Sequence, residues 1–404
     1  MNDEYDRNDP DLIVRVAAKG DGVTADGRFA PRAAPGDRLR PDGTVEPGPH
    51  NRVPPCRHFD VCGGCQLQHL DEAALTRFVT ERVVNAAEGQ GIAAGEVMPA
   101  HLSPPRSRRR ATLHAQLGGK RPLLGFREEG SHRIVHLDEC HVLAPELWAL
   151  VAPLRALLRP WTRRGSADIA LTLADQGVDV AIKGLEVDGL TQTEGVLDFA
   201  RALGLARLAL DLGYGAEALW EPEPTTVTLG GVPVGLPVGA FLQATRDGEA
   251  ALVADAREWL AGAGRVVDLF AGLGTFAFAL AGKAQVVAVE AARDAHLACR
   301  TAAGRARLPV EAIHRDLFRN PLQPDELARF DAAVIDPPRA GAKQQIARIA
   351  ESGLGRVVYV SCNPSSWAKD ARTLIDAGFR LEKLHPVGQF RWSTHVELAS
   401  LFVR

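Results

Sequence analysis

The chain has 404 residues and a mass of 43.3 kDa, enough for two or three domains at ~150 residues each. Hydrophobic residues make up 46% and charged residues 24%, which excludes a mostly disordered chain, a collagen and a coiled coil. The formal net charge of -3 means that any phosphate-binding surface has to be a local patch of cations.

Residues 1–50 are predicted to form a short β module. Strand patterns begin at Leu12 and at Gly27, with a turn at 19–22 between them, and the Pro- and Gly-rich stretch 41–55 is a predicted linker. The first thirty residues carry acids early and lack the apolar segment of a signal peptide. Because Asp268 and several glycines break the longest apolar runs further along, no membrane span is expected, and we expect a cytoplasmic protein.

Four cysteines suggest a metal site. Cys56, Cys62 and Cys65 lie close together, and Cys140 follows 75 positions after the third. Clustered thiols in a cytosolic protein of this size favour zinc or an iron–sulfur cluster over disulfides. A redox dithiol at Cys62 and Cys65 is the alternative, but it lacks a βαβ context. The interval between Cys56 and Cys62 departs from zinc-ribbon spacing, and the residues alone leave the kind of metal open.

Residues 51–240 are predicted to form a central α+β domain. A helix is expected over about 71–87, followed from about 100 by short alternating strands with helical segments near 144–158 and 197–203. Between His101 and Val135 there are eight Lys/Arg and two Glu. Arginine binds phosphate bidentately, so the densest run predicts an RNA-binding surface, although a solvated face is the plainer alternative. That run comprises Arg106, Arg108, Arg109 and Arg110.

Residues 241–404 are predicted to form an α/β domain of Rossmann type. From about 264, nearly continuous apolar strands alternate with helical segments, which is typical of a mostly parallel sheet covered on both faces. The predicted strands are RVVDLF, AQVVAVE, VEAIH, FDAAVID and RVVYVSC, with HVELASLFVR as the last.

The ends of these strands carry a ligand-binding pattern. After Asp268, Gly272 and Gly274 turn into a helix, and the next strand ends in Glu290, where a carboxylate can accept ribose hydroxyls. Later strands lead to Asp316 and Asp336. The loop lacks the third glycine of a dinucleotide site and the Lys of a P-loop, so an adenosine ligand without pyrophosphate, such as S-adenosylmethionine, fits best. A tight turn of no function is the alternative.

Two further residues are candidates for catalysis. Cys362 follows a buried strand and precedes a helix, whose N-terminus is expected to lower the thiol pKa and make Cys362 a nucleophile. Cys299 lies inside a helix and is interpreted as core. His395 and Glu397 have the same parity on the last strand, so they are expected to face one side together. Alone, Glu397 would be an ordinary surface residue.

As an ordered set, these motifs resemble the bacterial class I RNA uracil-5 methyltransferases, above all the iron–sulfur branch that acts on 23S ribosomal RNA. The resemblance covers nearly the whole chain, and the first 45 residues resemble a shortened TRAM module. It is carried by CRHFDVCGGCQLQHL, SRRRATLHAQ, FLQATRDGEAALV, VVDLFAGLGTFAFALA, DPPRAGA, VVYVSCNPSSWAKD and the terminal HVE.

The resemblance implies roles residue by residue. Cys56, Cys62, Cys65 and Cys140 would hold a [4Fe–4S] cluster, Cys362 would be the nucleophile and Glu397 the base. S-adenosylmethionine or the target base would be surrounded by Gln243, Phe270, Gly272, Gly274, Thr275, Glu290, Asp316 and Asp336. Relatives usually carry Asn where this chain has Thr275 and Thr245, and threonine keeps a hydroxyl but lacks the two-sided amide. RNA would be the partner, 23S ribosomal RNA first and transfer RNA second, with no obligate protein partner.

The implied chemistry is covalent catalysis. The Cys362 thiolate would add to carbon 6 of uracil, carbon 5 would attack the methyl sulfonium, and Glu397 would remove the carbon 5 proton before elimination. Asp336 would hydrogen-bond the uracil edge. A cytosine-5 enzyme would place a second Cys beside the proline motif, and an amino-group methyltransferase would carry an aromatic at Arg339. A catalytically silent iron–sulfur RNA-binding protein is the remaining rival.

Overall fold

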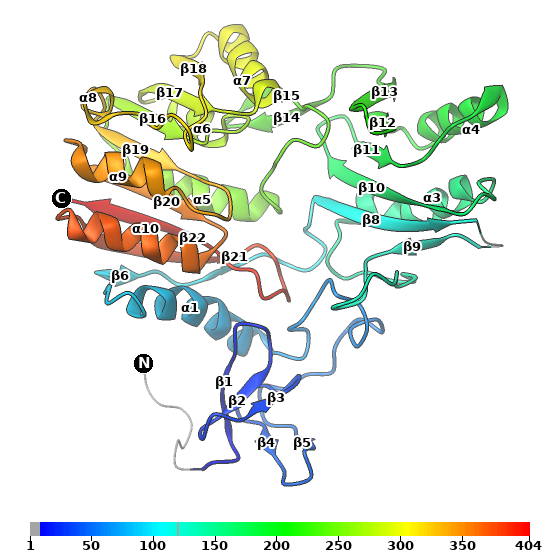
Figure 1. The fold of residues 1–404 in the computed structure, drawn as a ribbon, viewed down its shortest axis with the longest axis horizontal. Coiled ribbons are helices and arrows are strands. Elements are labelled where there is room, and N and C mark those ends of the chain that lie inside the picture. The colour runs from blue at the N-terminus through cyan, green and yellow to red at the C-terminus, as the bar shows by residue number, and fades with distance from the viewer. Residues whose placement is uncertain (1–8, 119–120) are drawn as a thin grey trace.

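The computed structural model describes residues 9–118 and 121–404 (Figure 1). Near the N-terminus, β1 (Ile13–Val16), β2 (Gly22–Thr24) and β3 (Phe29–Ala30) form an antiparallel sheet, and β4 (Arg38–Leu39) pairs with β5 (Val45–Glu46). The predicted turn at 19–22 connects β1 to β2. The prediction of a linker over 41–55 is wrong for its first residues, because β5 pairs with β4 in a hairpin.

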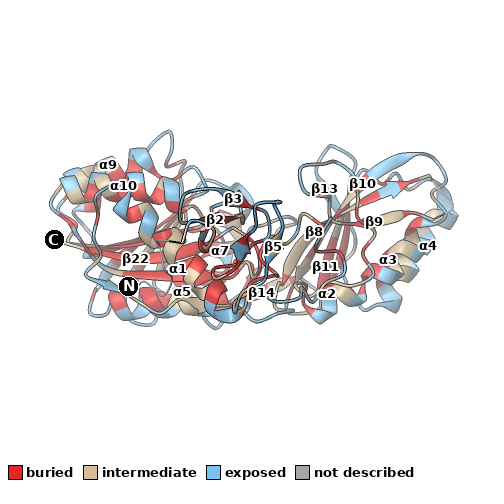
Figure 2. Cartoon of the chain, turned by 90° about the horizontal axis from the view of Figure 1, so that it is seen from below, coloured by how far each residue is buried: buried red, intermediate tan, exposed pale blue. Residues whose placement is uncertain are grey.

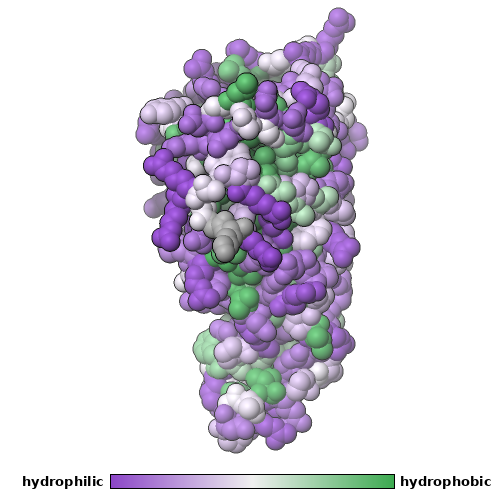
Figure 3. Space-filling model, turned by 90° about the vertical axis from the view of Figure 1, so that its right-hand side faces the viewer, coloured by the Kyte–Doolittle hydropathy of each residue, from purple (hydrophilic) through white to green (hydrophobic). Residues whose placement is uncertain are grey.

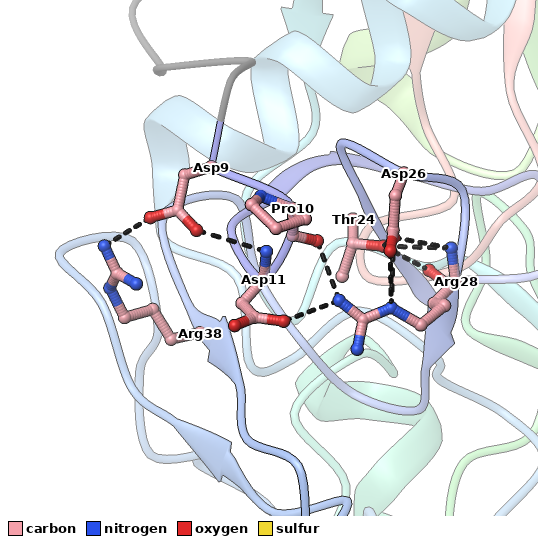
Figure 4. A network of polar contacts seen from close by, with 7 residues as sticks. All are labelled: Asp9, Pro10, Asp11, Thr24, Asp26, Arg28 and Arg38. Atoms are coloured by element: carbon pink, nitrogen blue, oxygen red, sulfur yellow. Dashed lines mark hydrogen bonds and ion pairs between the residues drawn. The ribbon is translucent and has the colours of Figure 1, made fainter.

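Arginines in this N-terminal part are neutralised by neighbouring carboxylates (Figure 4). Arg28 donates to Asp26 at 2.9 Å, to Asp11 at 2.6 Å and to the Pro10 carbonyl at 2.9 Å, and Arg38 pairs with Asp9. These pairs connect the segment before β1 to β2, β3 and β4. They also leave Arg28 and Arg38 with little positive charge for an external anion.

Helix α1 (Glu72–Glu88) confirms the predicted helix within one residue. It begins where the Asp71 side chain accepts the Ala74 N–H at 2.8 Å, a standard N-cap. Its buried face packs on the large C-terminal sheet, next to the short strands β6 (Glu96–Val97) and β7 (His101–Leu102), which pair with β21.

A six-stranded sheet with the order β13-β12-β11-β10-β8-β9 forms the middle of the molecule. Its longer strands are β8 (Arg110–Leu117) and β10 (Gly165–Leu173); the others are β9 (Leu123–Gly125), β11 (Val178–Lys183), β12 (Arg207–Asp211) and β13 (Ala216–Trp220). Helices α2 (Pro145–Ala149), α3 (Val151–Leu158) and α4 (Gly189–Ala202) contribute to its core. The hairpin of β14 (Thr226–Leu229) and β15 (Val232–Gly235) follows.

At β8 only one face of this sheet is buried, whereas β12 is buried on both faces. On β8, Leu113 and Ala115 are buried against the helices, whereas Thr112, His114 and Gln116 point to the opposite, open face. Helix α4 begins eight residues before the predicted helical segment at 197. Its first turns are rich in Gly and Thr, which have low helix propensity. The start of the helix was therefore not predicted from the sequence.

The C-terminal region is an α/β fold with a mixed sheet, in the order β18-β17-β16-β19-β20-β22-β21-β6. The five predicted parallel strands are present, and β22 runs antiparallel between β20 and β21. The strands are β16 (Arg265–Leu269), β17 (Gln285–Glu290), β18 (Val310–His314), β19 (Ala332–Ile335), β20 (Arg356–Ser361), β21 (Arg380–Gly388) and β22 (Glu397–Val403).

Helices cover both faces of this sheet, as predicted. One face carries α1, α8 (Pro324–Leu327), α9 (Lys343–Glu351) and α10 (Pro364–Asp376); the other carries α5 (Arg246–Trp259), α6 (Thr275–Leu280) and α7 (Arg293–Ala306). Figure 2 shows this sheet and the six-stranded sheet as two regions of buried residues at opposite ends of the molecule. In the described part of the chain, no helix has both the length and the apolar character needed to cross a membrane.

Candidate active site

The loop after β16 lies where the strand order reverses, since β17 and β19 flank β16 on opposite sides. In open α/β sheets, ligands bind at this switch point. Gly274 has φ +94°, and a Cβ there would lie 2.8 Å from the Phe278 ring and 2.9 Å from the Cys299 Sγ, so the position requires glycine. Cys299 is buried in the core beneath the loop, as predicted, and burial raises its pKa to about 12.

Two acids support this loop. Glu290, at the end of β17, accepts the Gly272 N–H at 2.8 Å and the Ala292 N–H at 2.6 Å. The buried Asp268 accepts the Ala277 N–H at 2.9 Å, and its other oxygen has no hydrogen-bond partner among the described residues. Burial raises the pKa of Asp268 to about 8. Glu290 is therefore placed at the predicted position, with its carboxylate oriented by the loop's own amides.

An aromatic pair stands beside the same loop. The Phe270 ring lies 5.3 Å from the ring of Phe318, which is 40% exposed. Asp316 accepts the Phe318 N–H at 2.9 Å, so this acid shapes the turn that presents Phe318. Phe270 has φ +61°, an uncommon conformation for a residue other than glycine. Phe318 was missed from the sequence, although it lies only two residues after the predicted Asp316. Thr275 begins α6 and is half-buried.

Four side chains form a hydrogen-bonded series at the neighbouring strand ends. Gln243 donates to Asp336 at 3.0 Å, and Gln389 donates both to the Gln243 side-chain oxygen at 2.7 Å and to Glu397. Gln243, Gln389 and Glu397 are each only 2% exposed. The Ala244 N–H donates to Gln389 at 2.8 Å, which fixes the orientation of that amide. The structure thus brings together three predicted residues through Gln389, which no spacing in the sequence had indicated.

Cys362 lies at the end of β20, half-buried, between these acids. Burial, together with the neighbouring Glu397 and Asp336, raises the pKa of the thiol to about 11, and Arg339 opposes this shift. The prediction that the helix N-terminus lowers this pKa is therefore wrong, because the thiol is buried beside two carboxyl groups. Burial also raises the pKa of Glu397 to about 7, and burial together with Glu397 raises that of Asp336.

His395 does not share a strand face with Glu397. It is exposed in the loop before β22, where its Nδ1 lies 3.3 Å from a guanidinium nitrogen of Arg339. The prediction that the two residues face one side is therefore wrong, because β22 begins only at Glu397. The Arg339 carbonyl accepts from Asn363 at 2.9 Å and from Ser366 at 3.0 Å, which holds the loop after β19 against the start of α10.

Thr245, at a position where the resemblance leads us to expect Asn, has a structural role. Its side chain is buried, caps α5 by accepting the Gly248 N–H at 3.1 Å, and lies 2.8 Å from the Ser103 hydroxyl. A hydroxyl is sufficient for both contacts, since Thr is a regular N-cap residue.

The predicted phosphate-binding run is largely internal. Arg109 is buried, pairs with Glu249 at 2.5 Å and donates to the Gln243 carbonyl at 2.9 Å, so its prediction as an RNA-binding residue is wrong. Arg110 donates to the Leu242 carbonyl at 2.9 Å, and Arg108 donates to the Arg110 carbonyl at 3.0 Å. Arg106 alone of the four is exposed. The run therefore supports the segment that carries Gln243.

Cys56, Cys62, Cys65 and Cys140 line one cavity of about 550 Å³. All four are free thiols, and burial raises the pKa of each, that of Cys65 to about 12. Among the described residues, no group of three or more His, Cys, Asp or Glu side chains is arranged to hold a metal ion. The thiols thus share a space without the close convergence that a single tetrahedral ion requires.

Comparisons with known proteins find relatives over nearly the whole chain. A model of the tRNA (uracil-5-)-methyltransferase family matches residues 311–404, which include β19, β20 and β22. An uncharacterized RNA methyltransferase of Zymomonas mobilis is 49% identical over 97% of this chain and 99% of its own length. A 23S rRNA (uracil(1939)-C(5))-methyltransferase of Chromohalobacter salexigens is 34% identical over 97% of this chain and 88% of its own.

A solved structure shares the fold. The tRNA (uracil-54, C5)-methyltransferase of Pyrococcus abyssi, in complex with S-adenosyl-L-homocysteine, has a TM-score of 0.76 to this chain. The match covers 97% of this chain and 99% of that one at 22% sequence identity. At that identity, the likeness supports the arrangement of the elements.

Proposed function

The chain belongs to the family of S-adenosylmethionine-dependent RNA uracil-5-methyltransferases, and on that premise we propose that it methylates carbon 5 of a uridine in 23S ribosomal RNA. One observation carries the proposal. Asp336, Cys362 and Glu397 stand at the ends of the neighbouring strands β19, β20 and β22, beside a loop suited to an adenosine ligand. The 34% identical relative named for 23S rRNA supports that substrate over transfer RNA.

The loop after β16 would hold S-adenosylmethionine, which supplies the methyl group when bound. Glu290 would accept hydrogen bonds from ribose hydroxyls, as acids at this strand end do. The tilted rings of Phe270 and Phe318 offer an apolar surface for the adenine. Gly272, Gly274 and Thr275 form the turn into α6, and Asp316 holds Phe318 in position.

Cys362 would attack carbon 6 of the uracil. The new S–C6 bond moves the C5=C6 electron pair into an enolate over carbon 5, carbon 4 and oxygen 4, and carbon 5 becomes nucleophilic. Burial and the neighbouring Glu397 raise the pKa of Asp336, which favours its protonated form, and the O–H of that form can donate to the uracil edge where charge develops. Arg339 is the nearby cation that favours the thiolate of Cys362.

Glu397 would act as the general base. After carbon 5 takes the methyl group, the carbon 5 proton passes to the carboxylate, the C5=C6 bond re-forms, and Cys362 leaves with the S–C6 electron pair. A pKa near 7 suits this transfer at neutral pH. Gln389, itself held by Ala244, fixes the carboxylate on the side that faces Cys362 and Asp336.

We also propose that Cys56, Cys62, Cys65 and Cys140 hold a [4Fe–4S] cluster. Four thiols around one cavity fit a cluster that takes one thiolate at each iron, and they do not converge on a single ion. When bound, the cluster would cross-link the four cysteines. Because methyl transfer moves no net electrons, we assign it a structural role.

This cross-link would support the loop that precedes the base. Ser393, Thr394 and His395 line the cysteine cavity. The Gln66 and Leu67 N–H groups, just after Cys65, donate to the Trp392 carbonyl at 2.7 and 2.9 Å. The cysteine segment and the loop before Glu397 are therefore joined backbone to backbone.

The test is to map the product. Anaerobically purified protein is incubated with S-adenosylmethionine and an unmodified 23S transcript or transfer RNA, and 5-methyluridine is located by mass spectrometry. We expect product at one 23S position and none in a parallel reaction with Cys362→Ala. Product on transfer RNA alone would support the proposed reaction and overturn 23S ribosomal RNA as the proposed substrate. No product on either RNA, with bound S-adenosylmethionine demonstrated, would overturn the proposed function.

A further inference from the structure

Two segments meet at the end of the six-stranded sheet that lies far from the catalytic crevice. They are the end of β8 with the start of β9, and the loop from α3 to β10. The Gly118 N–H donates to the Trp161 carbonyl at 3.2 Å, and a Cβ on Gly118 would lie 2.5 Å from the Arg164 Cα. Gly118 also has φ +85°, so the close backbone approach depends on glycine at this position.

This approach encloses a hollow of about 340 Å³ with arginines on both sides. Arg121 lines it from the segment before β9 and Arg164 from the loop before β10, together with Gln116, Leu117, Leu123 and Gly165. The indole nitrogen of Trp161 donates to the Glu186 carbonyl at 2.7 Å, which anchors the second loop to the chain after β11. Arg164 is thus presented by an anchored loop.

The hollow is strongly and locally basic. Arg121 and residues 159–165 together supply four arginines and no Asp or Glu. Arg121, Arg163 and Arg164, here called the distal patch, are all exposed. Glu186 lies 3.8 Å from Arg163, with side chains 81% and 92% exposed, a pair of little strength in water. Among the described residues, Arg121 and Arg164 have no ion-pair partner.

The distal patch differs from the other arginine groups of the chain. Arg28 and Arg38 are neutralised by acids of their own module, and Arg109 is buried against Glu249. At the distal patch, in contrast, the arginine side chains are exposed to solvent, and those of Arg121 and Arg164 line a hollow. Figure 3 looks onto this end of the molecule and shows hydrophilic residues gathered over it.

Strand β8 connects the distal patch to the active site. Its first residue, Arg110, donates to the carbonyl of Leu242, next to Gln243, and its last, Leu117, lines the hollow. Arg110 and Leu117 are seven residues apart in an extended strand, which at ~3.3 Å per residue places them roughly 23 Å from each other. A single strand of about seven stacked nucleotides, at ~3.4 Å each, has the same length. The uncovered face of the sheet, with Thr112, His114 and Gln116, lies between them.

We propose that the distal patch binds the sugar–phosphate backbone of the substrate RNA at a second place, remote from the modified base. This inference rests on the proposed function, because it takes RNA as the substrate. Two guanidinium groups on opposite sides of a hollow match phosphate oxygens, which arginine binds bidentately. RNA held there reaches the catalytic crevice along the open sheet face, and the contact adds affinity without a role in methyl transfer.

The test is a charge reversal in the full-length, cluster-loaded protein. Arg121→Glu with Arg164→Glu is compared with Arg300→Glu and Arg305→Glu, which make the same charge change on the exposed side of α7. Binding to a 23S transcript is measured over a salt series. We expect the distal-patch variant to bind at least ~10-fold more weakly and to lose about two from the slope of log K against log salt. Binding of S-adenosylmethionine and the rate at saturating RNA stay at wild-type values.

The outcomes separate this inference from the proposed function. If both double variants bind RNA alike, the distal-patch proposal is overturned, whatever the wild type methylates. If only the distal-patch variant loses affinity while the wild type methylates no RNA, the patch stands and the proposed function fails. Unchanged RNA binding with lost binding to poly-glutamate would assign the patch to an acidic protein and overturn the RNA proposal.

Discussion

The cavity lined by Cys56, Cys62, Cys65 and Cys140 and the crevice around Cys362 both hold thiols whose pKa is raised by burial, yet their neighbours differ. In the cavity, Cys140 acts electrostatically on each of the other three thiols. At the crevice, Cys362 faces the carboxyls of Glu397 and Asp336, whose own pKa values are raised. Grouped thiols suit a metal cluster, and a thiol beside one carboxyl that can donate a proton and one that can accept a proton suits covalent catalysis.

The largest expected effect comes from removing the single thiol of the crevice. Cys362→Ala should slow methylation by at least ~10³-fold. Among the described residues of the crevice, Cys362 is the nucleophile placed to add to carbon 6. Iron content and S-adenosylmethionine binding should match the wild type. Cys299→Ala, which removes a core thiol beneath the loop, should still methylate. A similar loss in both variants would contradict the distinction between the two positions.

The next effect concerns the acid that faces this thiol. Glu397→Gln should slow methylation by ~10²–10⁴-fold and leave a covalent protein–RNA adduct, visible on a denaturing gel, because addition proceeds without removal of the carbon 5 proton. In the wild type the rate should rise as pH passes through about 7, since the base works only when ionised. The variant should lack this rise. An adduct-free variant that keeps the rise would exclude Glu397 as the base.

The smallest effect on the chemistry is expected at the cysteine cavity. Cys65→Ser should lose most of the bound iron and lower the unfolding temperature by roughly 5–10 °C, a loss of a few kcal/mol for a protein of this size. Methylation should fall through reduced stability and should recover partly at low temperature. The check is to measure iron content and unfolding temperature in Cys65→Ser and in Cys362→Ala, which serves as the control that keeps its iron. Full iron content in Cys65→Ser would show that the cavity does not bind through that thiol.

Much of the fold was predictable because of apolar patterns. Strands β16, β17, β19 and β20 are nearly continuous apolar runs, so their existence and their burial followed from the sequence. The edge strand β18 was predicted as a strand, but none of its residues is fully buried. Helix α1 followed from regular spacing. Helix α5 was not predicted, and α4 was predicted too short, because polar and Gly/Thr-rich turns weaken the pattern that identifies a helix.

Within the site, positions were more predictable than environments. The ends of β19 and β20 place Asp336 and Cys362 where the motifs predict. The sequence shows neither how deeply the Cys362 thiol is buried nor which carboxyls lie beside it, so the predicted direction of its pKa shift was wrong. It also made buried Arg109 look like a surface cation, since a run of arginines has no periodicity that distinguishes inside from outside. The role of Gln389 could be recognised only from its hydrogen bonds to Gln243, Ala244 and Glu397 in the structure.

The position of β22 bears on how the enzyme is made. This strand is the last described in the chain, yet it lies between β20 and β21 in the sheet. During synthesis at ~5–20 residues per second, β20 and β21 leave the ribosome before the strand that joins them. Glu397 is the first residue of that strand, so in the proposed mechanism a nascent chain carries Cys362 while its base is still missing. We therefore expect catalytic competence to arise together with closure of the sheet, and unfinished chains to be inactive.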